Sequence, residues 1–182
     1  MSKCLVVGLY SGPGARKSTL AAHVFAELKW KNINCELVTE YAKDMVWGET
    51  TKVLENQTYV FGKQYNRIYR VAKHVDVLIT DSPLALSIIY DKKKSEHFKN
   101  LVMEKYNEFN NLNFFVIRCA EFNPKGRLHN EKEAEEKDQE VLNMLSENKI
   151  PFTTIRGERE SVGRIVDIIL EHKGKLECLN TK

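Results

Sequence analysis

Short apolar runs alternate with longer amphipathic stretches along most of the chain. The runs are rich in β-branched and aromatic residues and are too short for helices, which is typical of buried β-strands. Strands are predicted at residues 3–10, 35–40, 75–82, 113–118 and 151–155. Because such strands alternate with helical patterns, the sequence predicts an α/β fold in which helices flank a five-stranded parallel sheet.

Apolar residues recur at helical spacing between these runs. Helices are predicted at residues 18–30, 50–73, 132–148 and 160–173. The run "EKEAEEKDQE" at 131–140 is typical of a solvated helix face with i,i+4 pairs. The charged run "YDKKKSEHFKN" at 90–100 predicts a solvated loop or helix start. No repeat or linker interrupts the pattern, so a single domain over residues 1–182 is predicted.

Composition narrows the class of protein further. The chain has 182 residues, and 28 Lys and Arg against 25 Asp and Glu give a net charge of +3, too small to indicate nucleic-acid binding by itself. The four cysteines, Cys4, Cys35, Cys119 and Cys178, form no C-x-x-C pair and predict free thiols. No apolar run is long enough for a signal peptide or a membrane span, so a cytoplasmic enzyme or binding domain is expected.

The junction between the first strand and the first helix reads "SGPGARKST" and nearly matches the phosphate-binding pattern G-x-x-x-x-G-K-[ST]. In that setting, backbone N–H groups and the helix N-terminus attract phosphates. Lys17 would reach the β- and γ-phosphates of ATP, and the Ser18 hydroxyl would ligate Mg²⁺. The residues predicted to bind ATP here are Ser11, Gly12, Pro13, Gly14, Ala15, Arg16, Lys17, Ser18 and Thr19.

Ser11 and Arg16 stand where the pattern has glycine. Glycine is usual before the lysine because the backbone there passes close to the phosphates. The bulk of Arg16, and any backbone strain that it causes, predict a cost to the loop. Its guanidinium offsets this cost only in part if it points at the phosphates. The loop is therefore predicted to be a nucleotide site that Arg16 weakens or inactivates, with a plain strand–helix turn as the alternative.

Three later motifs, "TEYAKDM" at 39–45, "TDSP" at 80–83 and "FNPKGRLHNEKEAEEKD" at 122–138, complete a family resemblance. Together with the loop they resemble the P-loop kinases grouped around the ribosylnicotinamide kinase domain of the bacterial NAD-regulator protein. Many small phage-encoded ATPases or kinases are similar in the same way, which would place the chain in a host cytoplasm. The resemblance covers about residues 3–173 and implies a P-loop kinase fold with a small lid. Deoxynucleoside kinases look like more distant relatives.

The resemblance assigns roles to two acidic residues. Glu40 follows the second strand and is expected to take or orient the proton of the acceptor hydroxyl. Asp81 ends the third apolar run and is expected to hold Mg²⁺, together with Ser18. The alternatives are a salt-bridged or capping glutamate and a cap for the helix after Asp81. Many relatives carry arginine after this acid, whereas Ser82 stands there in this chain.

The segment "NPKGRLH" looks like a lid, placed at about residues 121–131. Lys125 and Arg127 would swing over bound phosphates, where a guanidinium suits the charge spread over phosphoryl oxygens. The alternative is a solvent-exposed basic loop. Lys17, Glu40, Asp81 and Arg127 are thus the predicted catalytic residues.

The acceptor is less well defined by the sequence. Aromatic, Gln and Arg side chains can stack on a base and read its edge, so Tyr41, Gln64 and Arg67 are predicted to bind the acceptor together with Glu40. The sequence favours a Mg²⁺–ATP-dependent kinase that acts on a hydroxyl of a nucleoside-like or nucleotide-like small molecule. The alternatives are a kinase acting on DNA, at a strand end or a modified base, and a nucleotide-binding protein without turnover. No membrane partner is expected.

Overall fold

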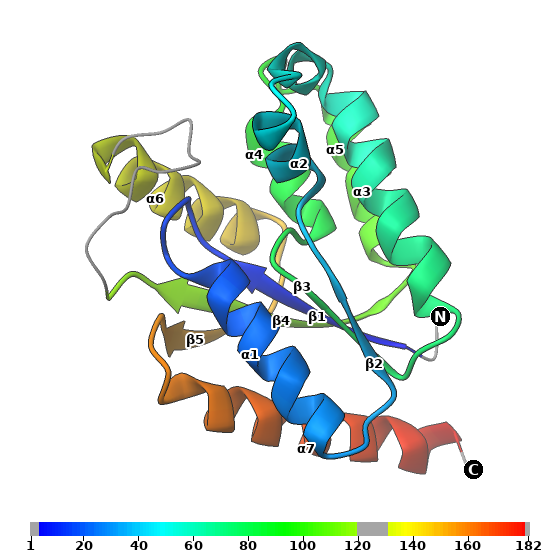
Figure 1. The fold of residues 1–182 in the computed structure, drawn as a ribbon. Helices are drawn as coiled ribbons and strands as arrows, with labels where there is room; N and C mark the ends of the chain where they lie inside the picture. Colours follow the sequence, from blue (N-terminus) through cyan, green and yellow to red (C-terminus); the bar gives the residue numbers. More distant parts are fainter. Residues whose placement is uncertain (1–3, 120–130, 181–182) are drawn as a thin grey trace.

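A parallel sheet of five strands forms the centre of the computed structural model, which describes residues 4–119 and 131–180. The strands lie in the order β2-β3-β1-β4-β5, and every pairing between them is parallel. Their bounds are β1 Leu5–Tyr10, β2 Cys35–Val38, β3 Val77–Thr80, β4 Asn110–Ile117 and β5 Thr153–Arg156. The predicted α/β fold with a five-stranded parallel sheet is therefore confirmed (Figure 1).

Helices connect successive strands. Their bounds are α1 Lys17–Trp30, α2 Tyr41–Trp47, α3 Gln57–Ala72, α4 Ser87–Tyr90, α5 Glu96–Tyr106, α6 Glu131–Glu147 and α7 Ser161–Asn180, with short 3-10 helices η1 Thr51–Glu55 and η2 Leu84–Leu86. The pattern predicted as one helix over 50–73 divides at Asn56, whose side chain accepts a hydrogen bond from Tyr59 N and so caps α3. None of the described helices is long and apolar enough to cross a membrane.

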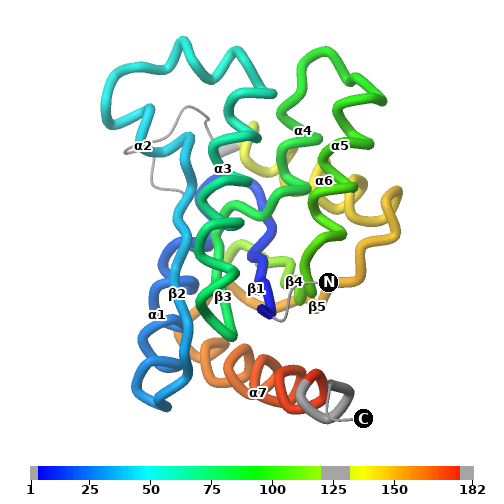
Figure 2. Tube along the Cα trace, turned by 90° about the vertical axis from the view of Figure 1, so that its right-hand side faces the viewer, coloured from blue at the N-terminus to red at the C-terminus, as the bar shows by residue number. Residues whose placement is uncertain are grey.

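The helices cover both faces of the sheet, which explains why the central strands β1 and β3 are buried at every residue. Leu5, Val7 and Leu9 of β1 pack in one cluster with residues of α1 and α7. Val6 belongs to a cluster with residues of α3 and α5. Figures 1 and 2 show α1 and α7 on one side of the sheet and α3 and α5 on the other. The sheet is thus a buried layer between two helical layers.

The register of the sheet brings the carboxyl ends of three strands to one edge. Gly8 of β1 and Val38 of β2 are both paired with Thr80 of β3. The segments that leave these strands, beginning near Ser11, Glu40 and Asp81, therefore start side by side. An added Cβ at Gly8 would lie 2.8 Å from Pro83 Cγ, so this glycine allows the chain after β3 to approach β1 closely.

Candidate active site

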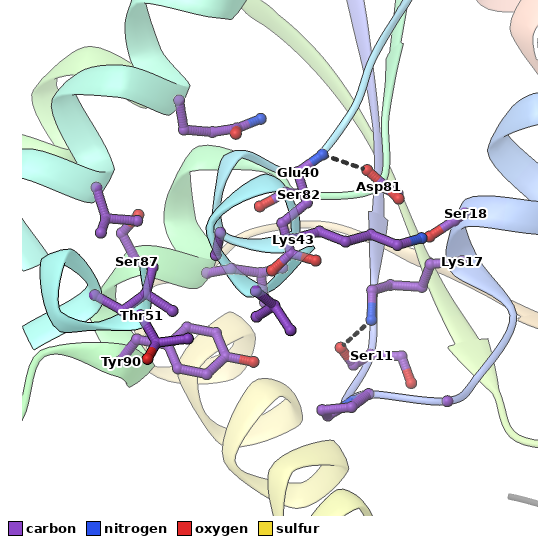
Figure 3. A pocket seen from close by; sticks show the side chains of 18 of the residues that line it. Ser11, Lys17, Ser18, Glu40, Lys43, Thr51, Asp81, Ser82, Ser87 and Tyr90 are labelled. Atoms are coloured by element: carbon purple, nitrogen blue, oxygen red, sulfur yellow. Dashed lines mark hydrogen bonds between the residues drawn. The ribbon is translucent and has the colours of Figure 1, made fainter. Parts of the chain in front are cut away.

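The loop between β1 and α1 has the hydrogen bonds of an organised phosphate-binding loop, called the P-loop below (residues 11–18). Lys17 Nζ donates to the carbonyl oxygens of Ser11 and Gly12, both at 2.8 Å (Figure 3). Gly14 and Arg16 both have left-handed backbones, with φ of 90° and 66°. Ser11, Pro13, Gly14, Arg16, Lys17, Ser18 and Thr19 line a pocket at the edge of the sheet.

Gly12 and Ala15 are covered by other elements instead of lining the pocket in the described part of the chain. An added Cβ at Gly12 would lie 2.4 Å from the carbonyl oxygen of Ala134 in α6, so the helix backbone packs directly on this residue. An added Cβ at Gly157 would lie 2.7 Å from the Ala15 carbonyl oxygen. Two glycines therefore let α6 and the segment after β5 close around the loop.

A carboxylate from α6 holds the first part of the P-loop. Asp138 Oδ1 accepts hydrogen bonds from Ser11 Oγ at 2.6 Å and from Gly12 N at 2.5 Å. Asp138 Oδ2 pairs at 3.0 Å with Arg118, which follows β4. Arg118 also donates to the carbonyl oxygen of Pro13 at 2.8 Å. Hence the run 131–140, expected to be a solvated helix face, carries a side chain that contacts the loop.

Glu40 and Asp81 lie together at the ends of β2 and β3. Asp81 is 3% exposed, and its Oδ1 accepts a hydrogen bond from Glu40 N at 3.0 Å (Figure 3). Glu40 occupies the N-cap position of α2, but its side chain makes no capping bond in the described structure. The next short helix, η2, has Pro83 at its N-cap instead of Asp81. The geometry thus differs from both capping alternatives, and both acidic residues line the same pocket as Lys17.

The pocket has a volume of about 620 Å³ and extends from the P-loop to α2, η1, α3 and α4. Its far wall is largely apolar, and the apolar lining residues there are Ala42, Val46, Trp47, Leu54, Val60 and Leu86. Lys43 and Lys92 add positive charge, and Thr51, Glu55, Gln57, Ser82 and Ser87 add polar groups. Ala42 and Lys43 lie within "TEYAKDM", Val46 and Trp47 follow it directly, and Ser82 lies within "TDSP", whereas no short motif in the sequence marks the other residues.

Tyr90 lines the pocket from the end of α4, and Figure 3 shows its ring. Burial raises the pKa of its hydroxyl far above the ordinary value, and the nearby carboxylates of Glu40, Glu140 and Asp138 raise it further. The hydroxyl is therefore neutral at any physiological pH. It can donate a hydrogen bond to a ligand in the pocket.

The three residues predicted to bind an acceptor differ in position. Gln64 lines the pocket, yet its Oε1 accepts from Tyr41 N at 2.9 Å, so it also joins α3 to the start of α2. Tyr41 and Arg67 do not line this pocket in the described residues; the guanidinium lies 5.1 Å from the Tyr41 ring centroid and pairs with Asp44. A role for Tyr41 and Arg67 in acceptor binding stays a prediction, and the pocket lends it no support.

Two oxygen donors in the pocket fit the predicted Mg²⁺. The Ser18 hydroxyl and the Asp81 carboxylate are hard ligands of the kind that Mg²⁺ prefers, and both line the cavity. Within the described ranges, no group of three or more His, Cys, Asp or Glu side chains could hold a metal ion. These residues therefore suit an ion that arrives with nucleotide phosphates. The predicted lid residues Lys125 and Arg127 lie outside the described residues.

Comparison with known proteins agrees with this arrangement. The family described as "AAA domain" matches residues 6–161. No curated protein matches the sequence. The solved structures that match include one titled "Crystal structure of NadR protein in complex with NAD and AMP-PNP", with a TM-score of 0.68 and 16% identity. The match covers 94% of this chain and 50% of the NadR chain, so this chain spans about half of that protein's length. The likeness shows that the two proteins share a fold.

Proposed function

The chain belongs to the AAA-domain family, and from this premise we propose that it is a Mg²⁺–ATP-dependent kinase that phosphorylates a hydroxyl group of a nucleoside-like or nucleotide-like acceptor. The observation that carries the proposal is a cavity that Lys17, Glu40 and Asp81 line together. One end of this cavity is a P-loop, and the other is an apolar wall of a size that suits a small molecule. The NadR structure with AMP-PNP, an ATP analogue, supports nucleotide as a ligand of this fold.

Each part of the cavity has a place in phosphoryl transfer. The P-loop N–H groups and Lys17 would bind the β- and γ-phosphates, which neutralises charge in the transition state. The acceptor oxygen attacks the γ-phosphorus, the bond from phosphorus to the β-bridging oxygen breaks, and ADP leaves. The proton of the acceptor hydroxyl passes to the Glu40 carboxylate. Asp81 holds the backbone of Glu40 through its hydrogen bond and so positions this base.

Mg²⁺, when bound with ATP, would supply additional charge neutralisation at the phosphates. Ser18 and Asp81 are the residues that would hold it, directly or through water. Arg16 adds a further positive charge at the pocket rim, where its exposed side chain can approach the nucleotide.

The far wall supports a flat, partly apolar acceptor. Trp47 is 67% exposed although it lines the cavity, so its ring is available to stack on a base. Lys43 and Lys92 would attract an anionic group, which favours a phosphorylated acceptor over a neutral one. The Tyr90 hydroxyl and Gln57 amide offer hydrogen bonds for orientation.

A panel of acceptors tests the proposal. Nucleosides, ribosylnicotinamide, nucleoside monophosphates and oligonucleotides are incubated separately with γ-labelled ATP and Mg²⁺, with Lys17→Ala as the inactive control. We expect label on one of the small acceptors. Label on oligonucleotides alone would instead make the chain a nucleic-acid kinase. Nucleotide binding without ADP formation against any acceptor would make it a non-catalytic binding protein.

A further inference from the structure

We propose that Asp138 and Arg118 are positioning residues that hold the P-loop in its phosphate-binding shape, and that the Ser11 hydroxyl completes this arrangement. We call these three side chains the clasp. The inference rests on the proposed function, because it concerns the loop that binds ATP. The inference gives the Ser11 side chain a role of its own, which the glycine usual at this position of the P-loop pattern could not have because it lacks a side chain.

The clasp has the features of a built interaction. The Asp138 side chain is 21% exposed and that of Arg118 is 12% exposed, and both carboxylate oxygens are engaged. In each hydrogen bond of Asp138 the acceptor is a charged carboxylate, and hydrogen bonds to a charged group are stronger than those between neutral groups. The direct packing of the Ala134 carbonyl on Gly12 fixes α6 against the loop at the same point. An exposed ion pair on a helix surface has none of these constraints.

The hydrogen bonds connect the clasp to the lysine that would bind phosphate. Asp138 fixes Ser11 and the N–H of Gly12, while Arg118 fixes the carbonyl of Pro13. The carbonyls of Ser11 and Gly12 are in turn the acceptors of Lys17 Nζ. A shift of Ser11 and Gly12 would therefore move the groups that orient Lys17.

The backbone conformation of Arg16 explains why the loop needs such support. Its φ of 66° and ψ of 21° lie in the left-handed region, which costs a non-glycine residue free energy. A conformation of this kind persists only where the surrounding structure holds it. The clasp holds the opposite end of the loop. The N–H groups between the two ends stay preorganised only while both ends, the clasp and the backbone of Arg16, keep their positions.

The dissociation constant of AMP-PNP with Mg²⁺ is measured for the wild-type protein and for Ser11→Ala, Asp138→Asn, Asp138→Ala and the double variant Ser11→Ala/Asp138→Ala. Glu136→Ala, which removes an exposed carboxylate from the same helix, is the matched control. We expect Asp138→Ala to weaken binding about tenfold or more, as for lost bonds to a charged group. Asp138→Asn should weaken it less, because its Oδ1 still accepts from Ser11 and Gly12. The double variant should bind within about twofold of Asp138→Ala, because the hydroxyl has already lost its partner.

Hydrogen exchange of the backbone amides of Gly12 and of residues 14–17, measured without nucleotide, is the second readout. Exchange should be faster in Asp138→Ala and unchanged in Glu136→Ala, since the clasp restrains the free loop. The inference is overturned if Asp138→Ala keeps wild-type affinity and exchange, or if the losses from Ser11→Ala and Asp138→Ala add independently. Failure of the wild-type protein to bind nucleotide would refute the proposed function, while the exchange data would still decide whether the clasp holds the loop. Should Asp138→Ala not fold, Ser11→Ala and the isosteric Asp138→Asn carry the same test.

Discussion

Arg16 occupies a backbone conformation in which glycine is favoured, at the point where the P-loop enters α1. The sequence predicted a cost at this residue from the bulk of its side chain and from any backbone strain that it causes. In the structure the side chain is exposed at the pocket rim, so the cost comes chiefly from the backbone. For an L-residue this conformation costs about 1–2 kcal/mol. Glycine avoids this cost, but its backbone has greater freedom in the unfolded chain, which cancels part of the gain in the free energy of folding.

Replacement of Arg16 by glycine should therefore improve the nucleotide site. We expect Arg16→Gly to bind ATP several-fold more tightly, equivalent to about 1 kcal/mol, and to transfer phosphate faster. Arg16→Ala is the matched control, because it removes the guanidinium and keeps the left-handed strain. Equal affinity and turnover in the arginine and glycine proteins would show that the loop has adapted to arginine.

Glu40 is the residue on which the chemistry of the proposal depends. Glu40→Gln keeps the size of the side chain and the backbone bond to Asp81, but it removes the carboxylate that, in the proposed function, would take the proton of the acceptor hydroxyl. We expect turnover to fall by about 10²-fold or more while ATP affinity stays nearly unchanged. Steady-state kinetics with the acceptor found in the panel, beside Glu55→Gln as a second pocket carboxylate, provide the measurement. Wild-type turnover in Glu40→Gln would remove Glu40 from the catalytic residues.

At the scale of elements, the sequence predicted all five strands and the helices α1, α3, α6 and α7, because their apolar patterns reflect burial between the sheet and the helices. It could not predict the partners of single polar residues on those helices. Asp138 lies in a run of charged residues that looks solvated, and Gln64 lies on a helix rich in aromatics. Each contacts a segment distant in the chain, the P-loop and the start of α2 respectively. Such contacts depend on how elements pack and leave no local pattern.

Gln64 should act as the connection between α3 and α2. It is 3% exposed, and its Oε1 accepts from Tyr41 N. Gln64→Leu has a similar volume but leaves that buried N–H without its acceptor, so we expect a loss of about 1–3 kcal/mol in the free energy of unfolding. Chemical denaturation of the variant measures this loss, with Gln139→Leu at an exposed position of α6 as the control. Equal losses in both variants would mean that the hydrogen bond contributes nothing.

At the scale of the whole molecule, the pocket brings together residues from Ser11 to Lys92. The half nearest the P-loop was predictable, because parallel strands end at one edge and Lys17, Glu40 and Asp81 follow strand ends. The opposite half was not, since η1, η2 and α4 are short elements without a clear period and supply Leu54, Leu86 and Tyr90. This wall of the pocket is formed by tertiary packing of short elements, which no local pattern in the sequence marks.

Nucleotide binding should stabilise the molecule as a unit, because the P-loop lies between β1, α1 and α6 and is in contact with the segment after β5. A ligand that binds only the folded chain, at about 100 times its dissociation constant, adds about 2.7 kcal/mol to the free energy of unfolding. For a domain of this size we expect AMP-PNP with Mg²⁺ to raise the melting temperature by roughly 5–10 °C. AMP, which lacks the β- and γ-phosphates that Lys17 would reach, should raise it much less, and Lys17→Ala should lose most of the effect. An unchanged melting temperature with AMP-PNP at high concentration would mean that this chain keeps the P-loop fold without its ligand.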